Sequence, residues 1–194
     1  MTIPSAPASH RLYLSQLALY LRDSRLILTT WDAYSARHSD PVTNEPYDED
    51  AYGRRQRERD ADTLAAFGRV YYHAHELVEV AEQQLAQVPV SDRTRHYTGQ
   101  VRELQQATEG LYAVHADWRA VREALPTMAK PGTAAYEDPL AESHAEAWHY
   151  LDQWTAHGQA LFAVNALAQR QSLAGAPVAG IVAPAPASAA SVRR

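Results

Sequence analysis

The stretch that decides the fold is residues 50–88, which read DAYGRRQRERDADTLAAFGRVYYHAHELVEVAEQQLAQV. This stretch predicts one long amphipathic helix, because its apolar residues recur at intervals of three and four with no proline between them. At 1.5 Å per residue the helix would be about 58 Å long. It cannot bury an apolar stripe alone, so the rest of the chain must supply partner helices. The stripe consists of Leu64, Phe67, Tyr71, Ala74, Val78, Ala81, Leu85 and Val88.

Three further segments show the same periodicity, and prolines separate them. Proline ends a helix because it lacks an N–H group and clashes with the preceding turn. The short connections between the segments predict antiparallel neighbours. We therefore expect an all-α fold, an antiparallel up-down-up-down four-helix bundle of long helices. A pair of long hairpins completed by a second copy of the chain fits the same pattern. The expected helices span about residues 9–38, 50–88, 92–125 and 138–171.

Capping residues mark where these helices begin. Ser9, and later Ser91 or Asp92, offer side-chain oxygens for the free amides of a first turn. Asp138 followed by Pro139 combines an N-cap acceptor with a proline at the first helical position. These residues predict the starts of the first, third and fourth helices.

Both ends of the chain differ in composition from the periodic part. Residues 1–8 carry two prolines among small residues and predict a flexible N-terminus. Residues 172–194 consist mainly of Ala, Pro, Gly, Val and Ser, a composition that buries too little surface to order itself. We expect one domain over residues 9–171, followed by an Ala/Pro-rich disordered tail.

Composition limits the classes of function. Eighteen basic and twenty-three acidic residues among 194 give a net charge of −5, which argues against nucleic acid as a partner. The chain has no cysteine, so disulfides and thiolate metal sites are excluded. No apolar run reaches the length of a membrane span, and the N-terminus lacks the pattern of a secretory signal. We expect a cytoplasmic protein with no membrane partner.

A basic run and two aromatic residues are candidate contacts for a protein partner. The run from Arg54 to Arg59 is bracketed by acidic residues, which is typical of an exposed face laced with salt bridges. A contact patch for an acidic partner is the alternative interpretation. Trp148 and Tyr150 border the apolar side of the fourth helix and predict an exposed aromatic contact surface. The candidate partner contacts are Arg54, Arg55, Arg59, Trp148 and Tyr150.

Ionisable residues on the apolar stripes predict a polar layer near one end of the core. Counting along antiparallel helices brings Asp32, Asp60, His115 and His144 to one level. Such groups must pair with one another or with water, so a structural layer that fixes the helix register is the simplest interpretation. A mononuclear metal or acid–base site is the alternative, with Asp60, His115 and His144 as the candidate metal ligands.

Other histidine motifs do not support a metal site. Glu146 and His149 have the Glu-x-x-His spacing of di-iron bundles, but both point away from the stripe of their helix. His73 and His75 diverge on a helix, which predicts His73 on the outer, solvated side. No phosphate-binding loop, dinucleotide fingerprint or nucleophile elbow occurs, and we expect no cofactor.

These observations predict a non-catalytic helical bundle acting as a protein–protein interaction adaptor, scaffold or accessory subunit. We expect it to form a homo-oligomer, buried mainly through residues 50–88 and 92–125. The alternative is a small helical enzyme or a metal- or ligand-binding bundle that uses the Asp/His layer at one end of the core.

Overall fold

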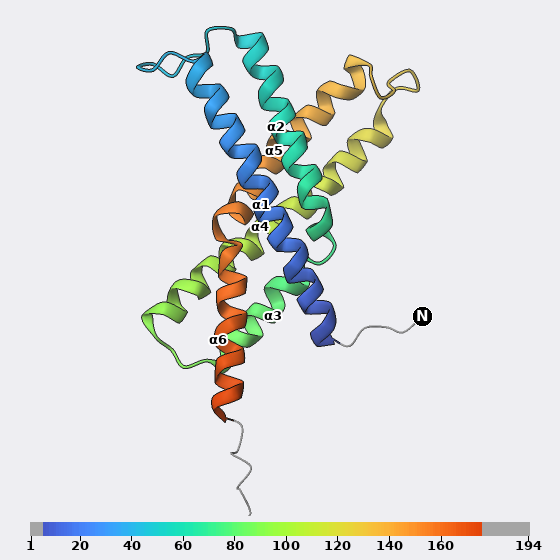
Figure 1. Ribbon diagram of the computed structural model, residues 1–194. Helices are drawn as coiled ribbons and strands as arrows, with labels where there is room; N and C mark the ends of the chain where they lie inside the picture. The colour runs from blue at the N-terminus through green and yellow to red at the C-terminus, as the bar shows by residue number, and fades with distance from the viewer. Residues whose placement is uncertain (1–5, 176–194) are drawn as a thin grey trace, which may run out of the picture.

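The computed structural model describes residues 6–175, which form six helices and no strand (Figure 1). Helix takes up 84% of the structure, so the all-α prediction is confirmed. Within the loop that follows the first helix, Ser39 and Pro46 form an isolated antiparallel bridge. The helices are α1 (Ala6–His38), α2 (Glu49–Tyr71), α3 (Ala74–Gln87), α4 (Asp92–Ala124), α5 (Ala134–His157) and α6 (Gln159–Gly175).

The helix ends follow the capping residues only in part. Ser91 caps α4 as predicted, because its hydroxyl accepts from Thr94 N and the Thr94 side chain accepts from Ser91 N. The Ser9 prediction is wrong, since α1 already begins at Ala6. Residues 6–8 and 172–175, predicted to be flexible or disordered, are helical. The remaining parts of both predicted flexible ends lie outside the described residues.

The prediction of one long helix over residues 50–88 is wrong, because this stretch forms two helices, α2 and α3. The break falls at Tyr72 and His73, where His73 N bonds to Val70 O at 2.8 Å and tightens the last turn of α2. Tyr112 Oη from α4 donates to Tyr71 O at 3.1 Å, so this carbonyl at the end of α2 has a partner from a distant helix. The His73 ring stacks on Tyr13 of α1 at 3.8 Å, which also corrects its predicted place on the solvated side.

The segment 138–171 begins earlier than predicted. Thr133 is the N-cap residue, with extended backbone angles, and α5 starts at Ala134. Thr133 O accepts from Glu137 N, while the Glu137 carboxylate accepts from Gly132 N at 2.8 Å. This interlocked turn starts the helix one turn before the Asp138-Pro139 pair, so Pro139 lies inside α5.

The same segment also breaks at Gly158, between α5 and α6. A Cβ added at Gly158 would lie 2.6 Å from Trp154 O and 3.1 Å from Leu21 Cδ2. Real Cβ atoms do not approach a carbonyl oxygen this closely, so only glycine fits between Trp154 O and Leu21 of α1 at this turn. The predicted fourth helix is therefore two helices with separate packing partners.

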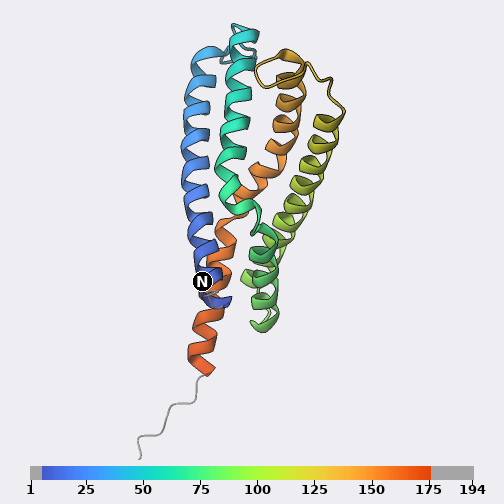
Figure 2. The ribbon, with the colours of Figure 1, turned by 90° about the vertical axis from the view of Figure 1, so that its right-hand side faces the viewer.

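The helices form an open arrangement rather than one closed bundle. In the upper half of both ribbon views, α1, α2, α5 and α4 stand side by side in this order (Figures 1 and 2). Here α5 packs against both α2 and α4, whereas α3 packs against α4 and α6 in the lower half. The α1–α2 and α4–α5 hairpins diverge toward their connecting loops (Figure 1). A single up-down-up-down four-helix bundle is thus not confirmed.

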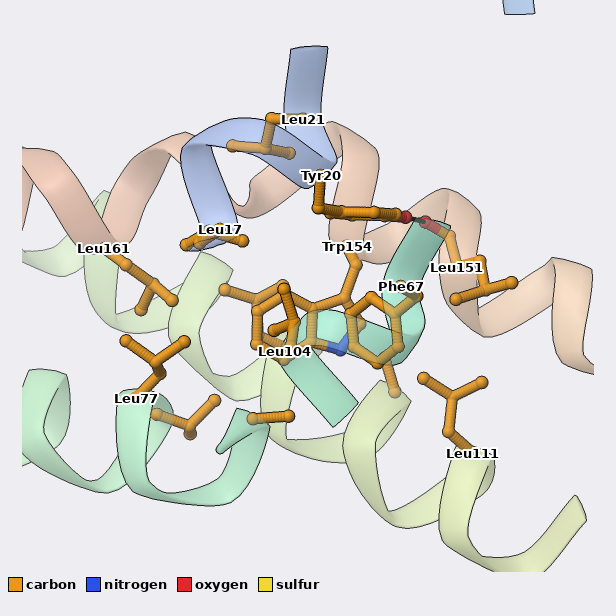
Figure 3. Close-up of a cluster of buried hydrophobic side chains, with 14 of the residues drawn as sticks. Leu17, Tyr20, Leu21, Phe67, Leu77, Leu104, Leu111, Leu151, Trp154 and Leu161 are labelled. Carbon is orange, nitrogen blue, oxygen red and sulfur yellow. Dashed lines mark hydrogen bonds between the residues drawn. The ribbon is translucent and has the colours of Figure 1, made fainter. Parts of the chain in front are cut away.

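The core lies where the two hairpins cross, and all six helices contribute to it. Trp154 and Phe67 pack with ring centroids 5.2 Å apart, and Phe67 meets Tyr20 edge-on at 5.0 Å. The Tyr20 hydroxyl donates to Leu151 O at 2.9 Å, and burial raises the Tyr20 pKa, so this phenol stays neutral. Figure 3 shows this cluster, with Leu17, Leu77, Leu104, Leu111 and Leu161 around the rings.

Candidate functional site

Arg59 and Asp60 form the most buried ion pair of the described residues. The Arg59 Nε and Nη2 atoms donate to Asp60 Oδ1 at 2.8 and 2.6 Å, and the Asp60 side chain is 2% exposed. The guanidinium also lies 4.6 Å from the ring centroid of Trp31 and 3.8 Å from that of Trp148. We call these four residues the Arg59 clamp. It joins α1, α2 and α5, because the planar cation faces both indole rings.

Burial dominates the electrostatics beside the clamp. It raises the pKa of Asp60 above its ordinary value, and the Arg59 and His144 charges act in the opposite direction. Burial likewise lowers the pKa of His144, and the carboxylates of Asp60 and Glu137 oppose this shift. His144 is therefore a neutral imidazole at pH 7, able to donate one hydrogen bond and accept another.

The predicted polar layer forms only in part. Asp60 and His144 come close enough to influence each other's pKa. His115 is exposed and its ring packs against Tyr71 at 5.4 Å, while Asp32 is exposed on α1. Within residues 6–175, no group of three or more His, Asp or Glu side chains is arranged to hold a metal ion. Asp32 and His115 are thus exposed rather than buried beside Asp60.

An apolar groove of about 310 Å³ opens beside His144. Its floor is α5, and its two walls are α2 and α4, which stand on either side of α5 (Figure 2). Tyr72, 82% exposed, stands at the α2 wall. The groove residues are Leu64, Phe67, Gly68, Tyr71 and Tyr72 of α2 and its end, Leu111, Val114, His115 and Trp118 of α4, and Leu140, Ser143, His144 and Ala147 of α5.

The predicted partner contacts mostly have neighbours within the chain. Arg55 pairs with Glu58 at 2.7 Å, as expected of a face laced with salt bridges. Arg59 and Trp148 belong to the clamp, and only Arg54 is fully on the surface. That a partner also contacts these residues stays a prediction.

Tyr150 packs against α4 rather than standing free. A Cβ added at Gly110 of α4 would lie 2.2 Å from Tyr150 Cε1. The missing side chain at Gly110 therefore lets the phenol ring lie against the helix backbone. This contact fixes α4 close to α5, and Tyr150 is half-buried in consequence.

One exposed feature was missed by the sequence analysis, namely a row of leucines on the outer face of α1. Leu12, Leu19 and Leu26 are 52%, 42% and 68% exposed and follow one another at intervals of seven. Leu14, Leu17 and Leu21 of the predicted stripe are buried on the opposite side. The heptad spacing is visible in the sequence and was the signal that could have revealed this second stripe.

Comparisons with known proteins leave the function to be argued from this geometry. The chain matches no protein-family model, and no match is found among curated proteins or solved structures. None of the described helices combines the length and apolar character needed to cross a membrane. The Arg59 clamp, the groove and the α1 leucines are therefore the features from which a function can be inferred.

Proposed function

We propose that this chain is a non-catalytic helical scaffold or adaptor that self-associates through the outer face of α1, in place of the interface through residues 50–88 and 92–125 that the sequence predicts. The observation that carries the proposal is the row of Leu12, Leu19 and Leu26, three large apolar side chains exposed on one face. Single exposed leucines are common, but a regular row along one helix is typical of an interface. In paired helices each of the two apolar heptad positions recurs at every seventh residue, and this row has the spacing of one of them.

The surroundings of the row suit close approach by a second helix. Ser15 and Ala18, exposed between Leu12 and Leu19, are small and leave room for another helix backbone. A second copy of α1 is the simplest partner, since a two-fold interface requires only that one surface complement itself. The three leucines are evenly spaced about Leu19, which meets this requirement.

The charges on the same face favour antiparallel pairing. Arg22 lies three residues after Leu19 and on its side of the helix, with most of its side chain exposed and its guanidinium paired with Asp23. In a parallel pair Arg22 would face its own copy, and burying two such ion pairs side by side in the seam would cost desolvation energy. With the two-fold axis at Leu19, Arg22 instead lies level with Gln16 of the second copy, and Leu12 faces Leu26.

This pairing would give the bundle order that was expected from the sequence. Because α1 and α2 are antiparallel neighbours in one chain, two such hairpins joined through α1 place four helices in alternating directions. In this proposal the up-down-up-down arrangement belongs to the dimer, and α5 and α4 of each copy follow beyond α2. The groove between α2, α4 and α5 remains outside the interface, whereas Leu26 borders Trp31 and Arg59 of the clamp.

Single cysteines test the proposal directly, because the natural chain has none. Under mild oxidation, we expect Leu19→Cys to form a disulfide-linked dimer with itself. We expect Leu12→Cys to remain monomeric alone and to crosslink when mixed with Leu26→Cys. Val121→Cys is the matched control, since Val121 on α4 is also 42% exposed.

Each pattern of crosslinks has a definite meaning. Crosslinking of Leu19→Cys at a rate well above that of Val121→Cys, together with the Leu12–Leu26 pair, supports the antiparallel dimer. Crosslinking of Leu12→Cys with itself contradicts the antiparallel geometry. Equal rates for Leu19→Cys and Val121→Cys would mean random collision and would overturn the proposal.

A further inference from the structure

We propose that the groove between α2, α4 and α5 binds a small, uncharged aromatic compound that carries one hydrogen-bond donor. This site is separate from the α1 face and does not depend on the proposed dimer. The inference rests on the volume of the groove, the character of its walls and the charges beneath its floor.

The volume of the groove, about 310 Å³, suits a small molecule. Small-molecule pockets begin at about 300 Å³ and are lined mainly by apolar and aromatic side chains. The groove therefore has room for one compound at the small end of this range.

The walls favour a flat aromatic ligand. Tyr71 contributes a ring from α2, and Trp118 contributes an indole from α4. Phe67 and Leu111 are buried behind these walls, and Leu140 of α5 adds aliphatic surface. Aromatic rings pack favourably edge-to-face or offset against other rings, so opposing aromatic walls select planar compounds.

The floor supplies the polar recognition. Ser143 and His144 are neighbours on α5 and both line the groove. Because burial keeps the imidazole neutral, its free nitrogen can accept a hydrogen bond from a ligand O–H or N–H group. The ligand donor replaces the water that would otherwise satisfy this half-buried side chain.

The charges below the floor disfavour anions. The carboxylates of Asp60 and Glu137 both act on His144, and the Arg59 cation is already bound by Asp60. Arg119 is exposed to solvent and acts on Tyr71 of the α2 wall, but it is not among the charges that act on His144. A negatively charged group placed at His144 would therefore meet two carboxylates, and no free cation of the described residues acts at that position.

Gly68 provides a means to fill the groove without disturbing the fold. It lies on the α2 wall, and an added Cβ would have no atom within 4 Å. Gly68→Leu should therefore occupy the groove and also favour the helix. Gly99→Leu is the matched control, because Gly99 is equally open within α4 but lies outside this groove.

The test is calorimetric titration of the full chain with three naphthalene derivatives. We expect 2-naphthol to bind with one molecule per chain, and 2-methoxynaphthalene, which lacks the donor, to bind several-fold more weakly. Naphthalene-2-sulfonate, an anion of similar shape, should bind at least tenfold more weakly than 2-naphthol. His144→Leu should remove the preference for 2-naphthol over the methoxy compound.

The groove variants decide whether the binding is at this site. Gly68→Leu should weaken 2-naphthol binding at least tenfold, while Gly99→Leu should leave it unchanged. Absence of saturable 2-naphthol binding to the natural chain would overturn the proposal. So would unchanged binding in Gly68→Leu, or a sulfonate that binds as tightly as the naphthol.

Discussion

Arg59 donates two hydrogen bonds to a single carboxylate oxygen of Asp60, its immediate neighbour in the chain. The two side chains meet because the guanidinium is held between Trp31 of α1 and Trp148 of α5. The ion pair is thus part of a three-helix contact rather than a local surface pair. Its strength depends on burial, since exposed pairs of this kind contribute little.

Removing the cation should destabilise the fold strongly. Arg59→Met leaves the Asp60 carboxylate buried without its partner, and we expect a loss of about 3 kcal/mol in the free energy of unfolding. The double variant Arg59→Met, Asp60→Leu removes both charges and should regain most of that loss. Urea denaturation measures both. A double variant no more stable than Arg59→Met would contradict the buried pair.

Removing the carboxylate alone should also destabilise the fold at pH 7. Asp60→Asn leaves the Arg59 guanidinium, 10% exposed, without its charged partner. We expect a loss of about 1–3 kcal/mol in the free energy of unfolding, since an amide oxygen replaces only part of the lost interaction. Thermal unfolding at pH 7 is the measurement, and a variant as stable as the natural chain would contradict the buried pair.

Replacing His144 should have little effect at pH 7 and a favourable effect in acid. The folded pKa of His144 lies below its ordinary value of 6.5, so stability is full above that value and falls as pH decreases through the folded pKa. His144→Leu removes this dependence and should be neutral or stabilising at pH 7, by at most about 1 kcal/mol.

The pH profile separates this effect from that of a second histidine. Burial also lowers the pKa of His10, so some acid destabilisation should persist in His144→Leu. Between pH 7 and pH 5 the free energy of unfolding of His144→Leu should therefore exceed that of the natural chain by an increasing amount, although it should still fall with pH itself. A difference that shrinks on acidification would contradict the lowered pKa of His144.

Because Gly110 contacts Tyr150, we expect Gly110→Ala to destabilise the natural chain and to stabilise a Tyr150→Ala variant. Gly110→Ala places a methyl group in the Tyr150 ring and should cost about 1–3 kcal/mol. In a Tyr150→Ala background the same change should stabilise α4 by about 0.5–1 kcal/mol, through helix propensity. Gly99→Ala, where space is open, should stabilise in both backgrounds. Additive effects of Gly110→Ala and Tyr150→Ala would show that the two residues do not touch.

The helical segments could be predicted from the sequence, but the breaks within them could not. Periodicity and proline positions located α4 to within one residue of its ends. The break at Tyr72 and His73 depends on Tyr112 and Tyr13, which reach it from α4 and α1. No local signal in residues 50–88 indicates contacts of this kind, so a run without proline predicts one continuous helix.

The candidate site was predictable to the same limited extent. Counting levels along antiparallel helices brought Asp60 and His144 together correctly. His115 lines the same groove as His144, but it is exposed and packs on Tyr71, so its side chain is not buried beside Asp60. Arg59 was assigned to an exposed face because its neighbours are charged. Only the approach of Trp31 and Trp148 from two other helices shows that its side chain is buried.

Sedimentation equilibrium of the full chain across a hundredfold dilution tests the proposed self-association through α1 most directly. We expect the natural chain to pass from dimer to monomer mass on dilution, and Val121→Glu to behave in the same way. Leu19→Glu should remain a monomer at every concentration, since it places two carboxylates at the two-fold axis. A natural chain of monomer mass throughout, or a Leu19→Glu variant with the mass of the natural chain, would contradict the proposal.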